Sequence, residues 1–359
     1  MEHPLLLDTQ RRLAGGALTL APMLDGTWEL PARYGADWRA EYEAVLKPGS
    51  VGLTDRSWLG VLELTGRDRQ TFLQGMVSND VAVASLQPGQ GRRAAFLDST
   101  GHILADLFVH ALPDKLLIET DPRCLDRLAQ TLDKYLIMEK VRLRDVSAEW
   151  ATLALQGERS EALAASVEDG TGGFAVPRRH SAAPGHDLWL PVEAAPAAWE
   201  RLIGYGAVPV GEEAREVLRV EAGLAAWGRE LNETVLLPEA GLDDAVSYTK
   251  GCYIGQEIVA RIAARGHTNR ALRGILLAQE AAVPKPGDTV HLPEDAPEAG
   301  REIGRVTSAV TSPKFGGRAL ALAYVRREHH APETPVAVHL RQPGGAVFAA
   351  AGEVRMPGG

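Results

Sequence analysis

Cysteines, aromatic residues and long apolar runs are all scarce in this chain of 359 residues. Its two cysteines, Cys124 and Cys252, are too few for a disulfide framework and indicate a reducing compartment. Aromatic residues make up 6% of the chain, and no apolar run approaches the ~18 residues that a membrane span needs. The opening MEHPLLLDTQRR lacks the basic and apolar regions of a signal peptide. We therefore predict a cytoplasmic protein that does not bind membranes.

Excess positive charge is also missing, because the formal net charge is -9. An acidic chain is a poor general ligand for nucleic acid. The segment ARIAARGHTNRALR, residues 260–273, is locally basic, but it is short and has no interleaved aromatic residues. We therefore do not expect direct nucleic-acid binding.

The sequence predicts three successive regions. Residues 1–145 are predicted to form an α+β region with a strand at 61–65, a β-hairpin over 91–112 that turns at Asp98–Gly101, and a helix after Asp121. Residues 146–270 are predicted to form a second α+β region. From residue 271 onward, short strands separated by Gly and Pro predict a small all-β domain, a sandwich or a barrel, over 271–359.

The stretch YTKGCYIGQEIVAR, residues 248–261, places Cys252 between two glycines and close to Lys250. A nearby cation and a helix N-terminus both favour the reactive thiolate, and the pattern predicts a helix that begins near Gly255. Cys252 and Lys250 are therefore the candidate catalytic residues. The alternative is a small thiol buried behind a tight turn. No Cys or His lies at ligand spacing, so we predict no metal site, and Cys124 lies in a helix as a structural residue.

The block KGCYIGQEIVAR resembles the signature of the YgfZ family of folate-binding proteins, which maintain or assemble iron–sulfur clusters. Three longer stretches resemble the glycine-cleavage aminomethyltransferases, the enzymatic relatives of that family: residues 25–81, 214–231 and 304–325. The resemblance implies an α+β fold of the aminomethyltransferase type. In that fold, two α+β domains and a C-terminal β-barrel surround a central folate cleft.

One carboxylate separates the two branches of this superfamily. The aminomethyltransferases carry a Gly-Gly-x-x-Asp-Asp block that supplies their catalytic carboxylate, and the matching stretch here is GHILADL. His102 replaces the second glycine, Ala105 falls where the first aspartate stands, and Asp106 matches the second. Neighbours on a strand point to opposite faces, so Asp106 is predicted to point away from the site. Loss of the transferase chemistry is expected if the first aspartate is the catalytic one.

A second departure concerns pterin recognition. The enzymes carry a Tyr-Thr-Gly-Glu-Asp-Gly block whose glutamate binds the pterin, and the nearest match, APGHDLWL, has His186 in its place. Glu221 is predicted to accept hydrogen bonds from the pterin instead. Pairs of arginines one helical turn apart are candidates for the glutamate tail of folate, although such pairs are often engaged by neighbours such as Glu212. The full predicted folate-binding set is Asp106, Arg215, Arg219, Glu221, Tyr253, Gly255, Gln256, Glu257 and Arg261.

The function predicted from this sequence is a YgfZ-like accessory factor that binds tetrahydrofolate or a derivative and supports iron–sulfur enzymes. Those client enzymes and reduced folate are its predicted partners. The contact with clients would be transient, since the chain has no cysteine set that could hold a cluster. The first alternative is a folate-dependent aminomethyltransferase or demethylase in which Asp106 is catalytic. The second is a thiol-based redox or scaffold module.

Overall fold

The structure, a computed structural model, describes residues 5–14, 16–23, 26, 28–168, 170–294, 300–341 and 347–359. The chain divides into two compact units, and each unit is assembled from separate stretches of sequence. Unit 1 consists of Met1–Phe96, Ala105–Arg215 and Ala245–Ile254, and unit 2 of Leu97–Leu104, Glu216–Asp244 and Gly255–Gly359. Among the described residues, no helix has both the length and the apolar character to cross a membrane.

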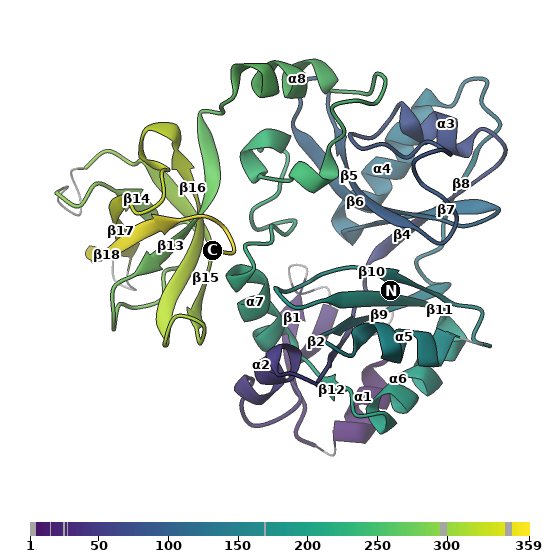
Figure 1. Cartoon of the computed structure of the whole chain (residues 1–359), viewed down its shortest axis with the longest axis horizontal. Coiled ribbons are helices and arrows are strands. Elements are labelled where there is room, and N and C mark those ends of the chain that lie inside the picture. Colours follow the sequence, from purple (N-terminus) through teal and green to yellow (C-terminus); the bar gives the residue numbers. More distant parts are fainter. Residues whose placement is uncertain are drawn as a thin grey trace. The chain divides into compact units, whose positions relative to one another are not determined.

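Unit 1 is built on two five-stranded sheets and a two-stranded ribbon (Figure 1). The first sheet has the strand order β5-β6-β7-β4-β8, the second has the order β10-β11-β9-β3-β12, and the ribbon is β1-β2. The strands are β1 (Thr19–Met23), β2 (Trp28–Arg33), β3 (Gly52–Asp55), β4 (Gly60–Thr65), β5 (Gly91–Leu97), β6 (Ile103–Ala111), β7 (Lys115–Thr120), β8 (Arg142–Asp145), β9 (Trp150–Gln156), β10 (Phe174–Pro177), β11 (Gly185–Pro191) and β12 (Val208–Pro209).

Helices cover the sheets of unit 1 and bury their apolar faces. They are α1 (Leu7–Ala14), α2 (Arg39–Leu46), α3 (Arg69–Gln74), α4 (Pro122–Tyr135), α5 (Ser160–Glu168), η1 (Val192–Ala194) and α6 (Ala195–Gly204), with α7 (Glu212–Glu221) running from unit 1 into unit 2. One core cluster joins Leu153 of β9 and Leu188 of β11 to Leu163 of α5 and Trp199 of α6. Such fully buried aromatic and aliphatic side chains dominate the stabilisation of a core of this kind.

Helix α4 shows how local sequence determines an element here. The Asp121 side chain accepts a hydrogen bond from the Arg123 N–H, so one of the unpaired N–H groups at the start of the helix is satisfied. Pro122 fits the first turn, where no amide hydrogen is needed. Leu125, Leu128 and Leu132 are all buried and recur at helical spacing. The helix ends at Tyr135.

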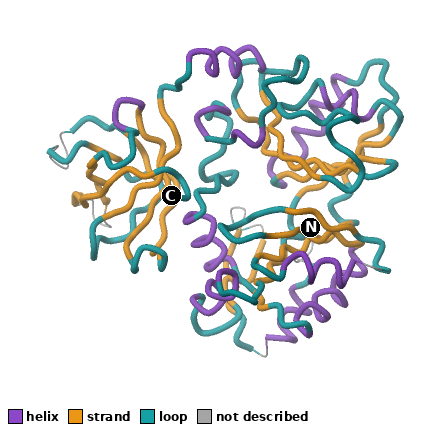
Figure 2. Tube along the Cα trace, in the orientation of Figure 1, coloured by secondary structure: helices purple, strands orange, loops and turns teal. Residues whose placement is uncertain are grey.

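Unit 2 contains a closed barrel with the strand order β13-β16-β15-β14-β17-β18. The strands are orange in Figure 2. These strands are β13 (Arg270–Leu277), β14 (Thr289–His291), β15 (Gly304–Ser312), β16 (Arg318–Arg326), β17 (Pro335–Arg341) and β18 (Val347–Arg355). Unit 2 also contains η2 (Leu237–Ala240), α8 (Gln256–Arg265) and η4 (Arg327–His329), and η3 (Asp243–Ala245) ends at its boundary with unit 1. Ile275, Val306, Ala321 and Val338 are among the side chains that fill the barrel.

The predicted fold class is confirmed, since the chain is a mixed α+β protein with a closed C-terminal barrel. The hairpin over 91–112, the helix after Asp121 and the helix near Gly255 are present as β5–β6, α4 and α8. Strand β18 was not predicted from the sequence. The domain boundaries at residues 145 and 270 stay predictions, although β3 and β9, which lie on either side of residue 145, pair within one sheet. The central folate cleft also stays a prediction.

Candidate functional site

The ammonium of Lys250 is enclosed by backbone carbonyls of unit 1. Its Nζ donates to the carbonyl oxygens of Gln74 at 2.6 Å, Val77 at 2.6 Å and Asn79 at 2.8 Å. Only 9% of the residue is exposed, and this burial lowers the pKa of Lys250 to about 8. All three ammonium hydrogens thus have acceptors. Lys250 therefore ties its own segment to the turn that follows α3.

The two cysteines lie in opposite environments. Cys252 is exposed, so the alternative of a thiol buried behind a turn is wrong. Cys124 is 3% exposed, and burial raises the pKa of its thiol to about 12, which fits its predicted structural place in a helix. Tyr253, next to Cys252, is 8% exposed and has the Lys250 Nζ 5.1 Å from its ring centre. A catalytic role for Cys252 or Lys250 stays a prediction.

Gly255 begins the second half of the motif, in unit 2. Its φ is 82°, in the left-handed region that disfavours side chains, and a Cβ there would lie 2.5 Å from the Asp98 carbonyl oxygen. Helix α8 follows at Gln256, where the sequence predicted it. Glu257 and Arg261 form an ion pair on its exposed side. Folate binding by these four residues stays a prediction.

Strand β6 places Ala105 and Asp106 on opposite faces. Ala105 is 1% exposed and faces the core, whereas the Asp106 side chain is 23% exposed. Arg93 of the neighbouring β5 grips both Asp106 oxygens, with Nε and Nη2 each donating at 2.9 Å. The predicted alternation is present, and which of the two faces belongs to the folate site stays a prediction. An unpaired carboxylate at the buried position of Ala105 would be costly to desolvate, whereas Asp106 is partly exposed and paired with Arg93.

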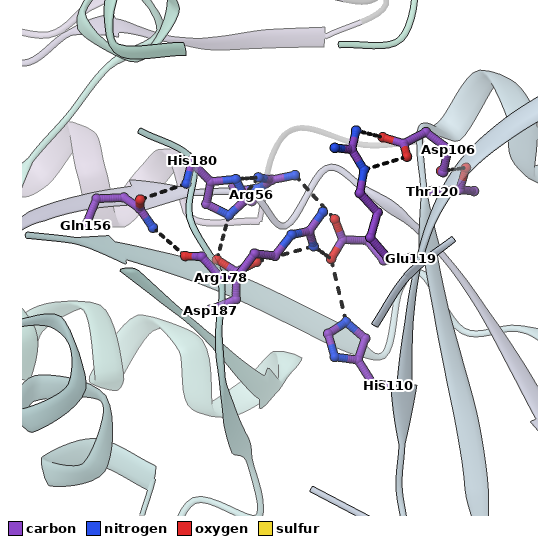
Figure 3. Close-up of polar contacts among 10 residues, drawn as sticks. Arg56, Asp106, His110, Glu119, Thr120, Gln156, Arg178, His180 and Asp187 are labelled. Atoms are coloured by element: carbon purple, nitrogen blue, oxygen red, sulfur yellow. Dashed lines mark hydrogen bonds and ion pairs between the residues drawn. The ribbon is translucent and has the colours of Figure 1, made fainter. Parts of the chain in front are cut away.

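A buried polar network in unit 1 lies close to Asp106, and the sequence did not predict it (Figure 3). Its centre is Glu119 of β7, whose two carboxylate oxygens accept hydrogen bonds from Arg56 and Arg178. Arg178 also reaches Asp187 at 3.4 Å, and the His180 Nε2 lies 2.8 Å from the other Asp187 oxygen. The one sequence signal for the network is the presence of charged residues inside apolar strands, as in KLLIET and GHDLWL.

The network keeps its carboxylates ionised and its imidazoles neutral. Burial alone would raise the pKa of Glu119, but Arg178, His110 and Arg56 hold it well below its ordinary value. Burial, reinforced by the Arg56 charge, lowers the pKa of His180 to about 4. Burial also lowers the pKa of His110, which lies 3.8 Å from Glu119. Near pH 7 this cluster therefore has alternating fixed charges around neutral histidines.

The structure places His186 and its neighbour Asp187 in different surroundings on β11. The His186 ring lies 3.2 Å from the Ser160 hydroxyl. The next residue, Asp187, is fully buried and belongs to the network around Glu119. Because neighbours on a strand point to opposite faces, Asp187 does not take the place of the pterin-binding acid, and pterin recognition stays a prediction.

The other residues predicted to bind folate form ion pairs or hydrogen bonds within this chain. Arg215 pairs with Glu212 in unit 1. In unit 2, Arg219 is 5% exposed and contacts Glu216, Glu230 and the Ser308 hydroxyl. Glu221 is also buried and accepts hydrogen bonds from Ser312 and from the Lys314 N–H. These contacts attach α7 to the barrel, and folate binding by these residues stays a prediction.

Two family profiles together match most of the chain. The profile of the GCVT N-terminal domain matches residues 19–173 and 180–250, and that of the glycine cleavage T-protein C-terminal barrel domain matches 270–351. The chain belongs to the glycine cleavage T-protein family. Among T-protein relatives, the aminomethyltransferase of Rubrobacter xylanophilus is 31% identical, with 84% of this chain and 82% of that protein covered. That of Halalkalibacterium halodurans is 29% identical, with coverage of 88% and 89%.

A solved T-protein structure has the same fold. The glycine cleavage system aminomethyltransferase T from Bartonella henselae superposes with a TM-score of 0.83 and covers 98% of this chain, at 23% sequence identity. The prediction of a YgfZ-like iron–sulfur factor is wrong, because relatives named aminomethyltransferase match most of the chain. The absence of a carboxylate at Ala105 therefore does not separate this chain from relatives named aminomethyltransferase.

Proposed function

We propose that this protein is a folate-dependent aminomethyltransferase in which Asp106 is the catalytic carboxylate. The placement of Asp106 on the accessible face of β6, held by Arg93, carries the proposal. Support comes from relatives named aminomethyltransferase that cover 84–88% of this chain. Transfer of a one-carbon unit between nitrogens creates positive charge on the nitrogen that holds it. A fixed carboxylate stabilises that charge and can accept the nitrogen's proton.

Tetrahydrofolate or a derivative, the cofactor predicted from the sequence, is the cofactor of this family. When bound, it supplies the nitrogens that accept the one-carbon unit. The polar groups of unit 1 close to Asp106 are the candidates for contact with such a heterocycle. Glu119 and Asp187 are buried carboxylates, and the buried donors Arg56 Nε and Trp189 Nε1 have no hydrogen-bond partner among the described residues. In this proposal the network orients the heterocycle, while Asp106 acts at the reacting nitrogen.

The test is formation of methylene-tetrahydrofolate from an aminomethyl donor by the intact protein and its Asp106→Asn variant. We expect the variant to lose a factor of about 10²–10⁴ in rate, because its amide cannot accept a proton or balance the charge. Asp114→Asn, a change at an exposed loop aspartate, should leave the rate unchanged. Calorimetric titration with tetrahydrofolate separates lost chemistry from lost binding. An Asp106→Asn variant that turns over at the unmodified rate would refute the assignment.

A further inference from the structure

The proposed function leaves the buried lysine of the motif without a role. Lys250 donates to three carbonyls that all belong to the segment Gln74–Asn79, which follows α3. A buried ammonium with three matched acceptors is costly to leave unpaired, so the contact fixes the segment firmly. The segment is also held from the Lys250 side by two further bonds. Ser78 Oγ donates to the Ala245 carbonyl at 2.6 Å, and the Ser247 N–H donates to the Ser78 carbonyl at 3.0 Å.

The same segment is bonded to strand β5. The Ala95 N–H donates to Ser78 Oγ at 2.8 Å, and the Ser78 N–H donates to the Ala95 carbonyl at 3.0 Å. The Asn79 side-chain amide donates to the Arg93 carbonyl at 2.8 Å. Segment 74–79 therefore lies between the lysine and the strand that carries Arg93.

Arg93 completes the path to the carboxylate. Its guanidinium grips both oxygens of Asp106, and a bidentate contact of this kind fixes the direction of the carboxylate as well as its distance. The chain of contacts thus runs from Lys250 Nζ to the Asn79 carbonyl, from the Asn79 amide to the Arg93 carbonyl, and from Arg93 to Asp106. Every member belongs to unit 1.

We infer that Lys250 is a positioning residue for Asp106, acting through segment 74–79 and strand β5. The inference rests on the proposed function, since it assigns Asp106 the catalytic role. Loss of the lysine contact would let the segment move, and Arg93 and Asp106 would move with it. A displacement of about 1 Å at a catalytic group can cost a factor of about 10² in rate.

The contact requires the charged form of the lysine. A neutral amine has two hydrogens for three carbonyls, so deprotonation removes at least one of the three hydrogen bonds. Burial lowers the pKa of Lys250 to about 8, and the nearby Asp80 opposes this shift. Tyr253, the other titratable group beside it, has a pKa raised to about 12 by burial and stays neutral in this range. The positioning contact should therefore weaken as the pH rises through about 8.

The experiment compares turnover in the intact protein with that of Lys250→Met, using tetrahydrofolate and an aminomethyl donor. We expect kcat to fall by about 10- to 100-fold while KM for tetrahydrofolate stays within about twofold. The unmodified protein should lose kcat above pH 8, and the methionine variant should lack that decline. Lys134→Met, at an exposed lysine near the end of α4, is the matched control and should behave like the unmodified protein.

A second variant tests the middle of the path. Asn79→Ala removes the side-chain amide bonded to Arg93 but keeps the backbone carbonyl that faces Lys250. We expect its kcat to fall as well, while the decline above pH 8 remains. This variant keeps the inference testable if Lys250→Met does not fold.

Two results would overturn the inference: an unchanged kcat in either folded variant, or a kcat of the unmodified protein that stays constant to pH 9.5. These outcomes differ from failure of the proposed function. If Asp106→Asn turns over normally, the catalytic assignment fails. If Asp106→Asn is inactive but either Lys250→Met or Asn79→Ala is folded and fully active, only the positioning role fails.

Discussion

His180 lies in the network of unit 1 between a cation and a carboxylate. Its backbone N–H donates to Gln156 Oε1 at 2.8 Å, and its ring contacts Arg56 and Asp187. Burial and the Arg56 charge lower the pKa of His180 to about 4, well below its ordinary value. The folded protein therefore resists protonation of this ring, whereas the unfolded chain takes up a proton near pH 6.5.

Acidification should destabilise the protein through this residue. Between pH 6.5 and 4 the unfolded state binds more protons than the folded state, so the free energy of unfolding falls as the pH falls. The loss attributable to His180 is up to about 3 kcal/mol, from a shift of about 2.5 pKa units at 1.36 kcal/mol each. Urea titrations at pH 7, 5.5 and 4.5 measure this slope.

A His180→Gln variant is the control for that slope. Between pH 6.5 and 4.5, the free energy of unfolding of this variant should change less with pH than that of the unmodified protein. Both proteins should lose further stability below about pH 4.5, where Glu119, with its depressed pKa, is protonated only in the unfolded state. Equal slopes in the two proteins would show that His180 does not resist protonation in the folded state.

At the level of single residues, sequence patterns indicated where a functional motif lies. They did not predict which contacts its side chains make. The spacing around Lys250 and Cys252 indicated a functional motif. Nothing local indicated that the lysine faces the carbonyls of residues 74–79, because those lie more than 170 positions earlier. Asp106 and Ala105 were assigned to opposite faces correctly, but which face is the core depends on helix packing that the alternation itself does not encode.

Among the secondary-structure elements, α4 gives the most direct stability test. Leu132 is fully buried on its inner face, and the helix packs on β4. Leu132→Ala should lower the free energy of unfolding by about 2–5 kcal/mol, because it removes buried methyl groups and leaves a cavity. Chemical denaturation at pH 7 measures the loss. Lys134→Ala, in the same helix but exposed, should change it by less than about 0.5 kcal/mol, and a similar loss in both variants would contradict the assigned packing.

Elements with strong local signals were predictable. Helix α4 has its Asp121 cap and a leucine stripe, and the β5–β6 hairpin has a turn at Asp98–Gly101. Strand β10 lies in a region rich in Ala, Gly and Pro, and β18 carries only a weak alternating pattern, so neither stood out. Their pairing with β11 and β17 supplies what the local sequence lacks.

At the scale of the whole molecule, a buried ion pair is among the contacts that attach α7 to the barrel. Arg219 Nη1 donates to Glu230 Oε2 at 2.8 Å, and Glu230 is fully buried while accepting hydrogen bonds from Thr307 and Ser308. Arg219→Met would leave that carboxylate buried without its cation. We expect a loss of about 3–5 kcal/mol in the free energy of unfolding. Denaturation of the intact protein checks this.

A double change distinguishes the ion pair from simple packing. If the cost arises from the uncompensated carboxylate, Arg219→Met combined with Glu230→Gln should be less destabilising than Arg219→Met alone. Additive losses would mean that the two residues contribute independently.

The discontinuity of unit 1 has a consequence for its synthesis. Its final stretch, Ala245–Ile254, is separated from the rest of unit 1 by Glu216–Asp244, which belong to unit 2. At ~5–20 residues per second, a ribosome needs a few seconds to add that intervening segment. During this interval residues 74–79 have been synthesised, but the ammonium that their carbonyls accept from has not. The Arg93–Asp106 pair therefore gains its support from Lys250 only when translation has passed residue 250.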